Sequence, residues 1–430
     1  DWNVAPRLGF AWRPAQNSKL VARGGVGVYF DRPSSRLGNL QIFNYPMDIV
    51  GLSVPLATNL TTFLSSPFPD LSGIKFPVSP ATAPSPVPYY SGGVPLGAFG
   101  LWTPISGIFS DKNLRTPYVY QYNLGVQYEI APDLLLETGY VGSRGVKLLN
   151  IYTFSQGPTG TAPYTTANGF SNQKILNGFQ EAKTDANSVY NSWQTSLTKR
   201  FSHGLQFLAS YTWSKSMDDI SGAATNEFVA LPGDQQNRAS NRAISDFDRR
   251  HRFVFSGVYD LPNFYKGDSK AGQRILNKWE TSGLLSWQSG APFTVVCQSG
   301  NTTYNRADLV NGQTAAMSGS VESRLGGYFN TAAFSPTCAN AAPYGTSPRN
   351  FLTGPRQRNV DLSIVKFIPL TEKTNMEFRT EFFNAFNLVN FANPVSGFTS
   401  AVPTSFATLG KITSTSSGPR VIQFALKFSF

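Results

Sequence analysis

The chain has 430 residues, of which 41% are hydrophobic, 13% are aromatic and only 14% are charged. Soluble domains usually carry about a quarter of charged residues. No stretch approaches the roughly 18 consecutive apolar residues that a membrane helix needs. The net charge of +11 comes from dispersed Lys and Arg, densest at Arg249–Arg252, which argues against a nucleic-acid partner. If the chain enters a membrane, it must do so as strands, because only helices and closed barrels satisfy the backbone in lipid.

Segments that alternate between apolar and polar residues run along the chain in pairs. In 118–130, Tyr, Leu, Val and Ile fall on one side, while Gln, Asn, Gly and Glu fall on the other. A period of two is typical of a strand with one apolar and one wet face. The predicted strands, about eleven, are Val4–Trp12, Leu20–Asp31, Tyr118–Ile130, Leu134–Ser143, Ser192–Phe201, Leu205–Ser216, Arg252–Leu261, Trp279–Gln288, Val360–Phe367, Asn375–Asn387 and Val421–Phe430.

The links between these strands alternate between short and long. The long links are rich in Gly, Pro, Ser, Thr and Asn, and lengths of this kind are abnormal inside a compact soluble domain. Outer-membrane barrels combine short periplasmic turns with long extracellular loops. The sequence therefore predicts an all-β, transmembrane antiparallel barrel. Its predicted long loops are Arg32–Thr116, Asn150–Val189, Met217–Phe247, Thr294–Pro355 and Val389–Gly418, and a short helix is expected in Asn263–Lys278.

The last segment shows the strictest alternation. Five apolar side chains at 422, 424, 426, 428 and 430 oppose a face that includes Gln423 and Lys427. A soluble sandwich strand can look the same, so this segment alone leaves both interpretations open. An aromatic residue at the end of the chain nevertheless resembles the closing strand of an outer-membrane barrel. In that arrangement Gln423 and Lys427 would face the lumen.

Polar side chains on two predicted neighbouring strands are candidates for a functional wall. Glu377, Arg379 and Glu381 alternate on one strand, and Asp361 lies on its predicted partner. They could form a track for a solute or a plug, or simply a mutually neutralising wall inside a wet lumen. His203 and His251 lie far apart, and no spacing of His, Cys, Asp and Glu indicates a metal site. We assign neither a cofactor nor catalysis.

The two cysteines, Cys297 and Cys338, fall in one predicted loop. They predict a disulfide in an oxidising compartment, which the loop-entropy model values at roughly 4 kcal/mol. Two free thiols are the alternative.

Several segments resemble TonB-dependent receptors of the Oar-like group. The resemblance spans nearly the whole chain except its loops, and it is most characteristic around 383–394. The segments that carry it are Asn3–Trp12, Arg23–Arg32, Ser210–Ser216, Asp246–Arg252, Phe383–Asn387 and Asn390–Pro394.

This resemblance implies a location in the bacterial outer membrane and a 22-stranded barrel that encloses an amino-terminal plug. It implies uptake of a large solute, such as an oligosaccharide, a peptide or a metal chelate, driven by the TonB complex acting on that plug. It also implies that the terminal aromatic residues, Phe428 and Phe430, are read by the barrel-assembly machinery. Outer-membrane lipid is a further expected partner.

The chain begins at Asp1 without Met, and it has no recognisable signal peptide, plug or TonB box. We therefore expect 1–430 to be the carboxy-terminal part of such a barrel, about eleven of its 22 strands. Two other hypotheses remain: a surface adhesion or structural protein on the same barrel, and a soluble secreted β-protein.

Overall fold

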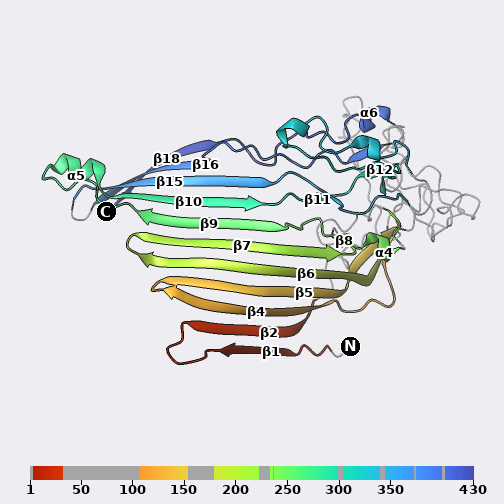
Figure 1. Cartoon of the computed structure of the whole chain (residues 1–430), viewed down its shortest axis with the longest axis horizontal. Helices are drawn as coiled ribbons and strands as arrows, with labels where there is room; N and C mark the ends of the chain where they lie inside the picture. Colours follow the sequence, from red (N-terminus) through yellow and green to blue (C-terminus); the bar gives the residue numbers. More distant parts are fainter. Residues whose placement is uncertain are drawn as a thin grey trace, which may run out of the picture.

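The computed structural model describes residues 3–31, 107–153, 179–221, 233–235, 237–298, 304–338, 344–371, 374–399 and 402–430. A sheet of thirteen strands dominates it, and eleven of these strands form one continuous path of antiparallel neighbours (Figure 1). They are the eleven predicted strands in the predicted order. The path is β1 (Arg7–Trp12), β2 (Leu20–Phe30), β4 (Tyr118–Ala131), β5 (Leu134–Thr153), β6 (Phe179–Ser202), β7 (Leu205–Asp218), β9 (His251–Asp260), β10 (Trp279–Gln288), β15 (Gln357–Pro369), β16 (Asn375–Phe383) and β18 (Val421–Ser429).

The strand register sorts the side chains into two faces, because directly paired residues on neighbouring strands point to the same side. Starting at Trp213, the pairs lead through Trp193 on β6, Tyr140 on β5 and Leu124 on β4 to the first strands. We call this side the apolar face. Its exposed hydrophobic side chains include Leu8, Phe10, Trp12, Val26, Tyr120, Leu124, Val126, Tyr128, Tyr140, Trp193, Tyr211, Trp213, Tyr259, Ile364, Phe378, Ile422, Phe424, Leu426 and Phe428.

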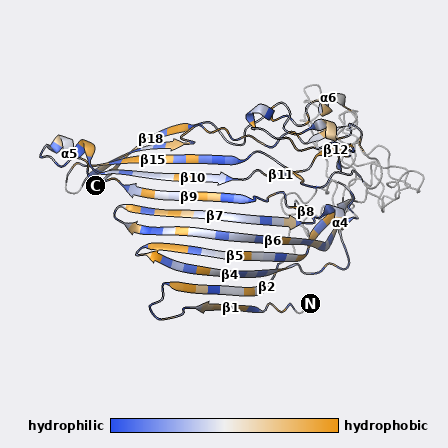
Figure 2. Ribbon diagram, in the orientation of Figure 1, coloured by the Kyte–Doolittle hydropathy of each residue, from blue (hydrophilic) through white to orange (hydrophobic). Residues whose placement is uncertain are grey.

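Aromatic residues gather near both ends of the apolar face. Toward the long-loop end, the ring of His251 lies 6.2 Å from that of Tyr211 and 6.3 Å from that of Trp287. Toward the short-turn end lie Trp12 and Trp279. Figure 2 shows hydrophobic and hydrophilic residues interleaved along the strands between these ends. Paired aromatic belts around an apolar band are typical of strands that cross an outer membrane.

The opposite side, the polar face, carries charged, amide and hydroxyl side chains. Near its middle, Gly125 and Gly139 are paired directly on β4 and β5. A Cβ atom added to Gly139 would lie 2.7 Å from the Cα atom of Gly125 and 2.8 Å from the carbonyl oxygen of Leu124. The absence of a side chain at Gly139 therefore permits the close approach of these two strands.

Short elements occupy the predicted long loops. β3 (Gly107–Ser110) pairs with β6, and β8 (Ala243–Ile244) pairs with β7. Two small sheets contain the remaining strands: β11 (Pro292–Phe293) with β14 (Leu352–Thr353), and β12 (Val296–Gln298) with β13 (Tyr304–Arg306) and β17 (Gly397–Thr399). The helical elements are α4 (Arg238–Asn241), α5 (Lys270–Leu276), η3 (Glu322–Arg324), η4 (Thr331–Ala333) and α6 (Pro403–Phe406). Among the described residues, no helix is long and apolar enough to cross a membrane.

The two ends of the sheet differ in what they carry. The loops that contain α4, β12 and α6 lie at one end, and α5 lies with the carboxy terminus at the other (Figure 1). The short helix predicted in Asn263–Lys278 is thus confirmed as α5. We call the described parts of 289–356 and 384–420 the cap.

The interpretation of all long links as loop material was wrong in part. β5 continues ten residues beyond its predicted end at Ser143, and β6 begins thirteen residues before Ser192. These extensions bury Ile151, Ala182 and Ala186 between polar neighbours. The extensions lie beyond the aromatic belt, so neither side of them carries a continuous apolar stripe. A search for period-two alternation therefore cannot find them.

Candidate functional site

The predicted polar residues on β16 and β18 lie together on the polar face. The guanidinium group of Arg379 pairs with Glu377 at 2.6 Å and with Glu381 at 3.6 Å along one strand. In the β16–β18 register, Lys427 lies opposite Glu377, and Gln423 lies opposite Glu381. The Arg379 side chain is 44% exposed, so these pairs stabilise the fold by no more than about 1 kcal/mol. Their chief effect is to present a nearly neutral, hydrated surface.

Asp361, which we grouped with these residues, has a different set of contacts. Its carboxylate accepts hydrogen bonds from the Asn359 side chain and from the backbone N–H of Asn384, each at 2.8 Å. Asn384 begins the turn after β16 and has a positive φ of 50°. Asp361 therefore stabilises the turn at the end of β16. It forms no ion pair with Arg379.

A polar hollow of about 460 Å³ opens on the polar face above the glycine pair of β4 and β5. Because Gly125 and Gly139 lack side chains, longer neighbours surround an indentation there. Glu137 accepts hydrogen bonds from Gln127 and, at 3.4 Å, from Ser196. The polar side chains that line the hollow include Arg23, Asn123, Gln127, Glu137, Gln194, Ser196, Ser210 and Thr212. No local sequence pattern predicts this hollow, because its residues come from five strands.

The cap has its own hydrophobic core and a disulfide. Cys297, on β12, is bonded to Cys338, and their Cα atoms lie 5.5 Å apart, which confirms the predicted disulfide. β12 pairs antiparallel with β13 and parallel with β17, so two long loops that are far apart in sequence join in one small sheet. The buried core consists of Phe293, Val295, Cys297, Ala307, Ala315, Tyr328, Phe329, Ala333, Phe334, Leu352, Phe398 and Leu409.

We expect the disulfide to stabilise the cap and to have little effect on the main sheet. Replacing Cys338 by Ser should lower the stability of the cap by about 4 kcal/mol at most, which is the loop-entropy value of the crosslink. The cap should still fold, because its core residues still pack. Limited proteolysis should then cut the cap faster than in the unmodified protein, while the heat-modifiable mobility of the barrel stays unchanged. Equal cap proteolysis before and after the substitution would contradict a stabilising role.

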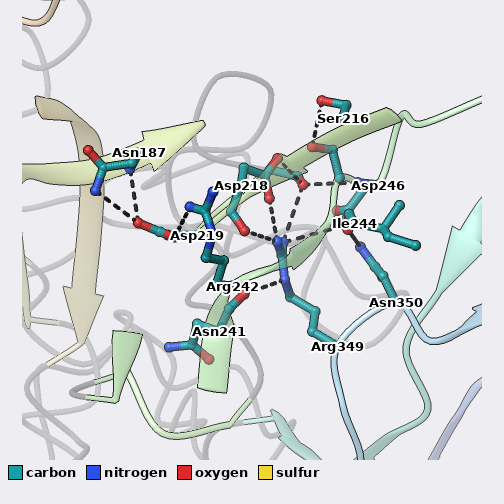
Figure 3. Close-up of polar contacts among 12 residues, drawn as sticks. Asn187, Ser216, Asp218, Asp219, Asn241, Arg242, Ile244, Asp246, Arg349 and Asn350 are labelled. Atoms are coloured by element: carbon teal, nitrogen blue, oxygen red, sulfur yellow. Dashed lines mark hydrogen bonds and ion pairs between the residues drawn. The ribbon is translucent and has the colours of Figure 1, made fainter. Parts of the chain in front are cut away.

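A buried arginine attaches the cap to the end of β7 (Figure 3). Arg349 is 2% exposed, and its guanidinium group pairs with the carboxylate of Asp218, which is 3% exposed. It also donates to the backbone oxygen of Asp218 at 2.8 Å, to that of Asn241 at 3.0 Å and to the Ser221 hydroxyl at 3.2 Å. Five donors directed at several acceptors suit a buried guanidinium group. The residue thus links the cap to the loop after β7.

A second basic cluster surrounds Asp219 beside this network. The carboxylate of Asp219 pairs with Arg238 at 3.0 Å and with Arg242 at 3.3 Å, and it also accepts from the backbone of Asn187 at 3.0 Å. Nearby, the buried Arg306 donates to the backbone oxygen of Ser240 at 2.8 Å. Burial and the charge of Arg349 lower the pKa of Arg306, an effect that Asp234 opposes.

Two of the motifs that carry the family resemblance contact each other here. The backbone N–H of Ser216, on β7, donates to the carboxylate of Asp248 at 2.6 Å, and the hydroxyls of Ser216 and Ser245 lie 2.9 Å apart. The Ser214 hydroxyl donates to the backbone oxygen of Arg249 at 3.0 Å. These motifs therefore act as structural ties at the loop end of the sheet.

Asparagines of the segments 383–387 and 390–394, which also carry the resemblance, stabilise the turn after β16. The side chain of Asn384 accepts from the N–H of Leu388 at 2.7 Å, and Asn387 accepts from the N–H of Arg420 at 3.1 Å. Asn390 exchanges two hydrogen bonds of 2.8 Å with the backbone of Arg358. Asn384 and Asn387 both have φ values of 50°, which Asn tolerates better than most residues.

The terminal aromatic residues lie at the short-turn end of the sheet. Phe428 pairs with Met376 on the apolar face, whereas Phe430 follows the last residue of β18 and is fully exposed. Their predicted recognition by the assembly machinery stays a prediction. Among the described residues, no group of three or more His, Cys, Asp or Glu side chains could hold a metal ion.

Three solved structures are similar to this chain over nearly its whole length. The outer membrane transporter YddB from Escherichia coli superposes with a TM-score of 0.51 at 10% identity, covering 99% of this chain and 40% of YddB. The FrpB iron transporter from Neisseria meningitidis gives 0.44 at 10% identity, covering 99% and 39%. The siderophore receptor PirA from Acinetobacter baumannii gives 0.44 at 10% identity, covering 100% and 41%. The chain thus spans about two fifths of the length of these structures.

No match to a curated protein sequence was found. The family described as the outer membrane beta barrel domain matches residues 1–423, nearly the whole chain. Its match agrees with the apolar face, the aromatic belts and the strand order. This chain is therefore an outer-membrane protein and belongs to the outer membrane β-barrel domain family.

Proposed function

We propose that this chain forms part of the wall and the outer cap of a TonB-dependent receptor that takes up a large solute. The observation that carries the proposal is the continuous division of eleven strands into an apolar and a polar face, with a folded cap at one end. The similarity of the strand arrangement to YddB, an outer membrane transporter, supports it. The segments that resemble Oar-like receptors are the reason that the proposal includes a 22-stranded barrel with a plug.

In this proposal the apolar face contacts lipid, the polar face lines the lumen, and the cap lies outside the cell. The hydrated wall around Arg379 and the hollow beside Glu137 would contact the solute or the plug. The TonB complex would act through the plug, and the strands that complete the barrel would lie elsewhere in the parent protein. The solute would be an oligosaccharide, a peptide or a metal chelate.

Uptake by cells that express the full-length parent tests this function. Radiolabelled maltodextrins, peptides and ferric chelates would be supplied to cells with and without a working TonB complex. The proposal expects one class to accumulate only when both the receptor and TonB are present. Cell adhesion without TonB-dependent accumulation of any class would favour the alternative, a surface adhesion or structural barrel.

The orientation gives a separate prediction. Ser318 lies exposed in the cap, and Asp268 lies exposed in the α5 connection at the other end. A membrane-impermeant maleimide should label Ser318→Cys in intact cells and should label Asp268→Cys only after the outer membrane is opened. The native cysteines are disulfide-bonded and give no background. Labelling of Asp268→Cys alone in intact cells would reverse the orientation.

A further inference from the structure

At its cap end, on strands β4 to β7, the apolar face carries basic side chains. Lys215 is exposed two residues beyond Trp213 on the same side of β7. On β5, the exposed Arg144 pairs in register with Tyr120 of the apolar face. The ammonium group of Lys147 lies 5.5 Å from the ring centre of Tyr118, which belongs to the same face. We call Arg144, Lys147 and Lys215 the outer basic cluster.

The strand lengths place this cluster at the rim of the membrane. Arg144 is ten residues from Leu134, where β5 leaves its turn, and Lys215 is ten residues from Leu205, where β7 leaves its turn. Ten residues extend about 33 Å along a strand. At the usual tilt of roughly 40° they rise about 25 Å, which is the height of the apolar band of outer-membrane barrels. The cluster therefore lies at headgroup level.

The residues around the cluster complete an interfacial site. Asn191, on β6, pairs in register with Lys215, and its side-chain oxygen accepts from the hydroxyls of Tyr140 at 2.6 Å and Tyr122 at 3.3 Å. Trp193 and Trp213 lie directly below as an exposed aromatic pair. Aromatic rings of this kind favour the boundary between hydrocarbon and headgroups. The site thus has an apolar floor and a cationic upper edge.

Within the part of the chain that the structure describes, no carboxylate forms an ion pair with Arg144, Lys147 or Lys215. Three cations turned outward at headgroup level attract anionic lipid, and Arg binds phosphate oxygens through two hydrogen bonds at once. We propose that the outer basic cluster binds the phosphate groups of the outer-leaflet glycolipid, with its acyl chains against Trp193 and Trp213. This inference rests on the orientation in the proposed function, and it is independent of transport.

Native mass spectrometry of the full-length parent in detergent tests the site. The protein would be titrated with deep-rough lipopolysaccharide, with the same glycolipid stripped of its phosphates, and with phosphatidylglycerol. The phosphorylated glycolipid should bind about tenfold tighter than either of the others, as the attraction of several cations for a phosphorylated headgroup predicts. Equal binding of the dephosphorylated form would overturn the proposal, and tighter binding of phosphatidylglycerol would do the same.

The variants separate this site from the overall positive charge. Arg144→Gln, Lys147→Gln and Lys215→Gln combined should abolish the preference for phosphate. The matched control, Lys266→Gln, Lys270→Gln and Arg274→Gln, removes the same charge from exposed positions near α5 and should keep the preference for phosphate.

Heat-modifiable mobility reports whether each variant folds. If the triple variant fails to fold, Lys215→Gln alone should lower the preference for phosphate about threefold. An unchanged preference in a folded triple or single variant would reject the site. Solute uptake, measured separately, tests only the transport function.

Discussion

Replacing Phe424 by Arg should sharply reduce the folded protein recovered in outer membranes. Phe424 is 66% exposed on the apolar face, and its ring stacks on Phe378 with centres 6.2 Å apart. An arginine near the middle of the lipid-facing band of a barrel costs about 2–4 kcal/mol. Loss of the stacked ring pair adds about 1 kcal/mol. The heat-modifiable fraction of the full-length parent measures the effect.

The adjacent residue provides a matched control. Gln423 lies on the polar face opposite Glu381, so Gln423→Arg places the same new charge beside a carboxylate in the proposed lumen. Lumen substitutions are tolerated in such barrels. Recovery of Gln423→Arg should therefore equal that of the unmodified protein. Similar losses for Phe424→Arg and Gln423→Arg would mean that β18 has no lipid-facing side.

Replacing Arg349 by Met should detach the cap from the end of β7. The substitution leaves the carboxylate of Asp218 buried without its counter-charge and removes hydrogen bonds to the backbone of Asp218 and Asn241. Removing one partner of a buried ion pair typically costs 3–5 kcal/mol, so we expect about that loss in cap stability. Hydrogen exchange of the cap and of 237–250 should become much faster, while the strands below remain protected.

Arg242→Met is the matched control, because Arg242 also pairs with an aspartate of this loop but has a 41% exposed side chain. Asp219 keeps Arg238 and the backbone N–H of Asn187 as partners when Arg242 is replaced, so cap exchange should change little. Equally faster hydrogen exchange of the cap in both variants would show that the number of positive charges, and not the buried contacts of Arg349, stabilises the loop end of the sheet.

The sequence predicted the eleven strands because lipid imposes an apolar residue at every second position wherever a strand crosses the membrane. The segments 118–130 and 421–430 show this directly. Beyond the membrane rim the constraint ends. The extensions of β5 and β6 and the small sheets of the cap are stabilised by tertiary packing, so no local period marks them.

The site was predicted less completely than the strands. Glu377, Arg379 and Glu381 could be grouped because they share one strand, and Cys297 with Cys338 because both fall in one loop. Arg349 and Asp218 are 131 residues apart, and nothing in the local sequence pairs them. The only local signal was the motif 246–252, whose Asp246 and Asp248 lie beside this network. Asp361 lies on the same face as Arg379, but its hydrogen bond to the backbone of Asn384 could not be predicted, because it depends on the turn after β16.

A nitroxide scan along β18 tests the central claim most directly. Spin labels at each position from Ile422 to Phe428 in the full-length parent would be read for collision with oxygen, which concentrates in lipid, and with a water-soluble nickel chelate. The account predicts a period of two, with oxygen favoured at 422, 424, 426 and 428 and nickel favoured at 423, 425 and 427. Uniform accessibility along the strand, or an alternation with the opposite phase, would contradict a barrel wall with its apolar face in the membrane.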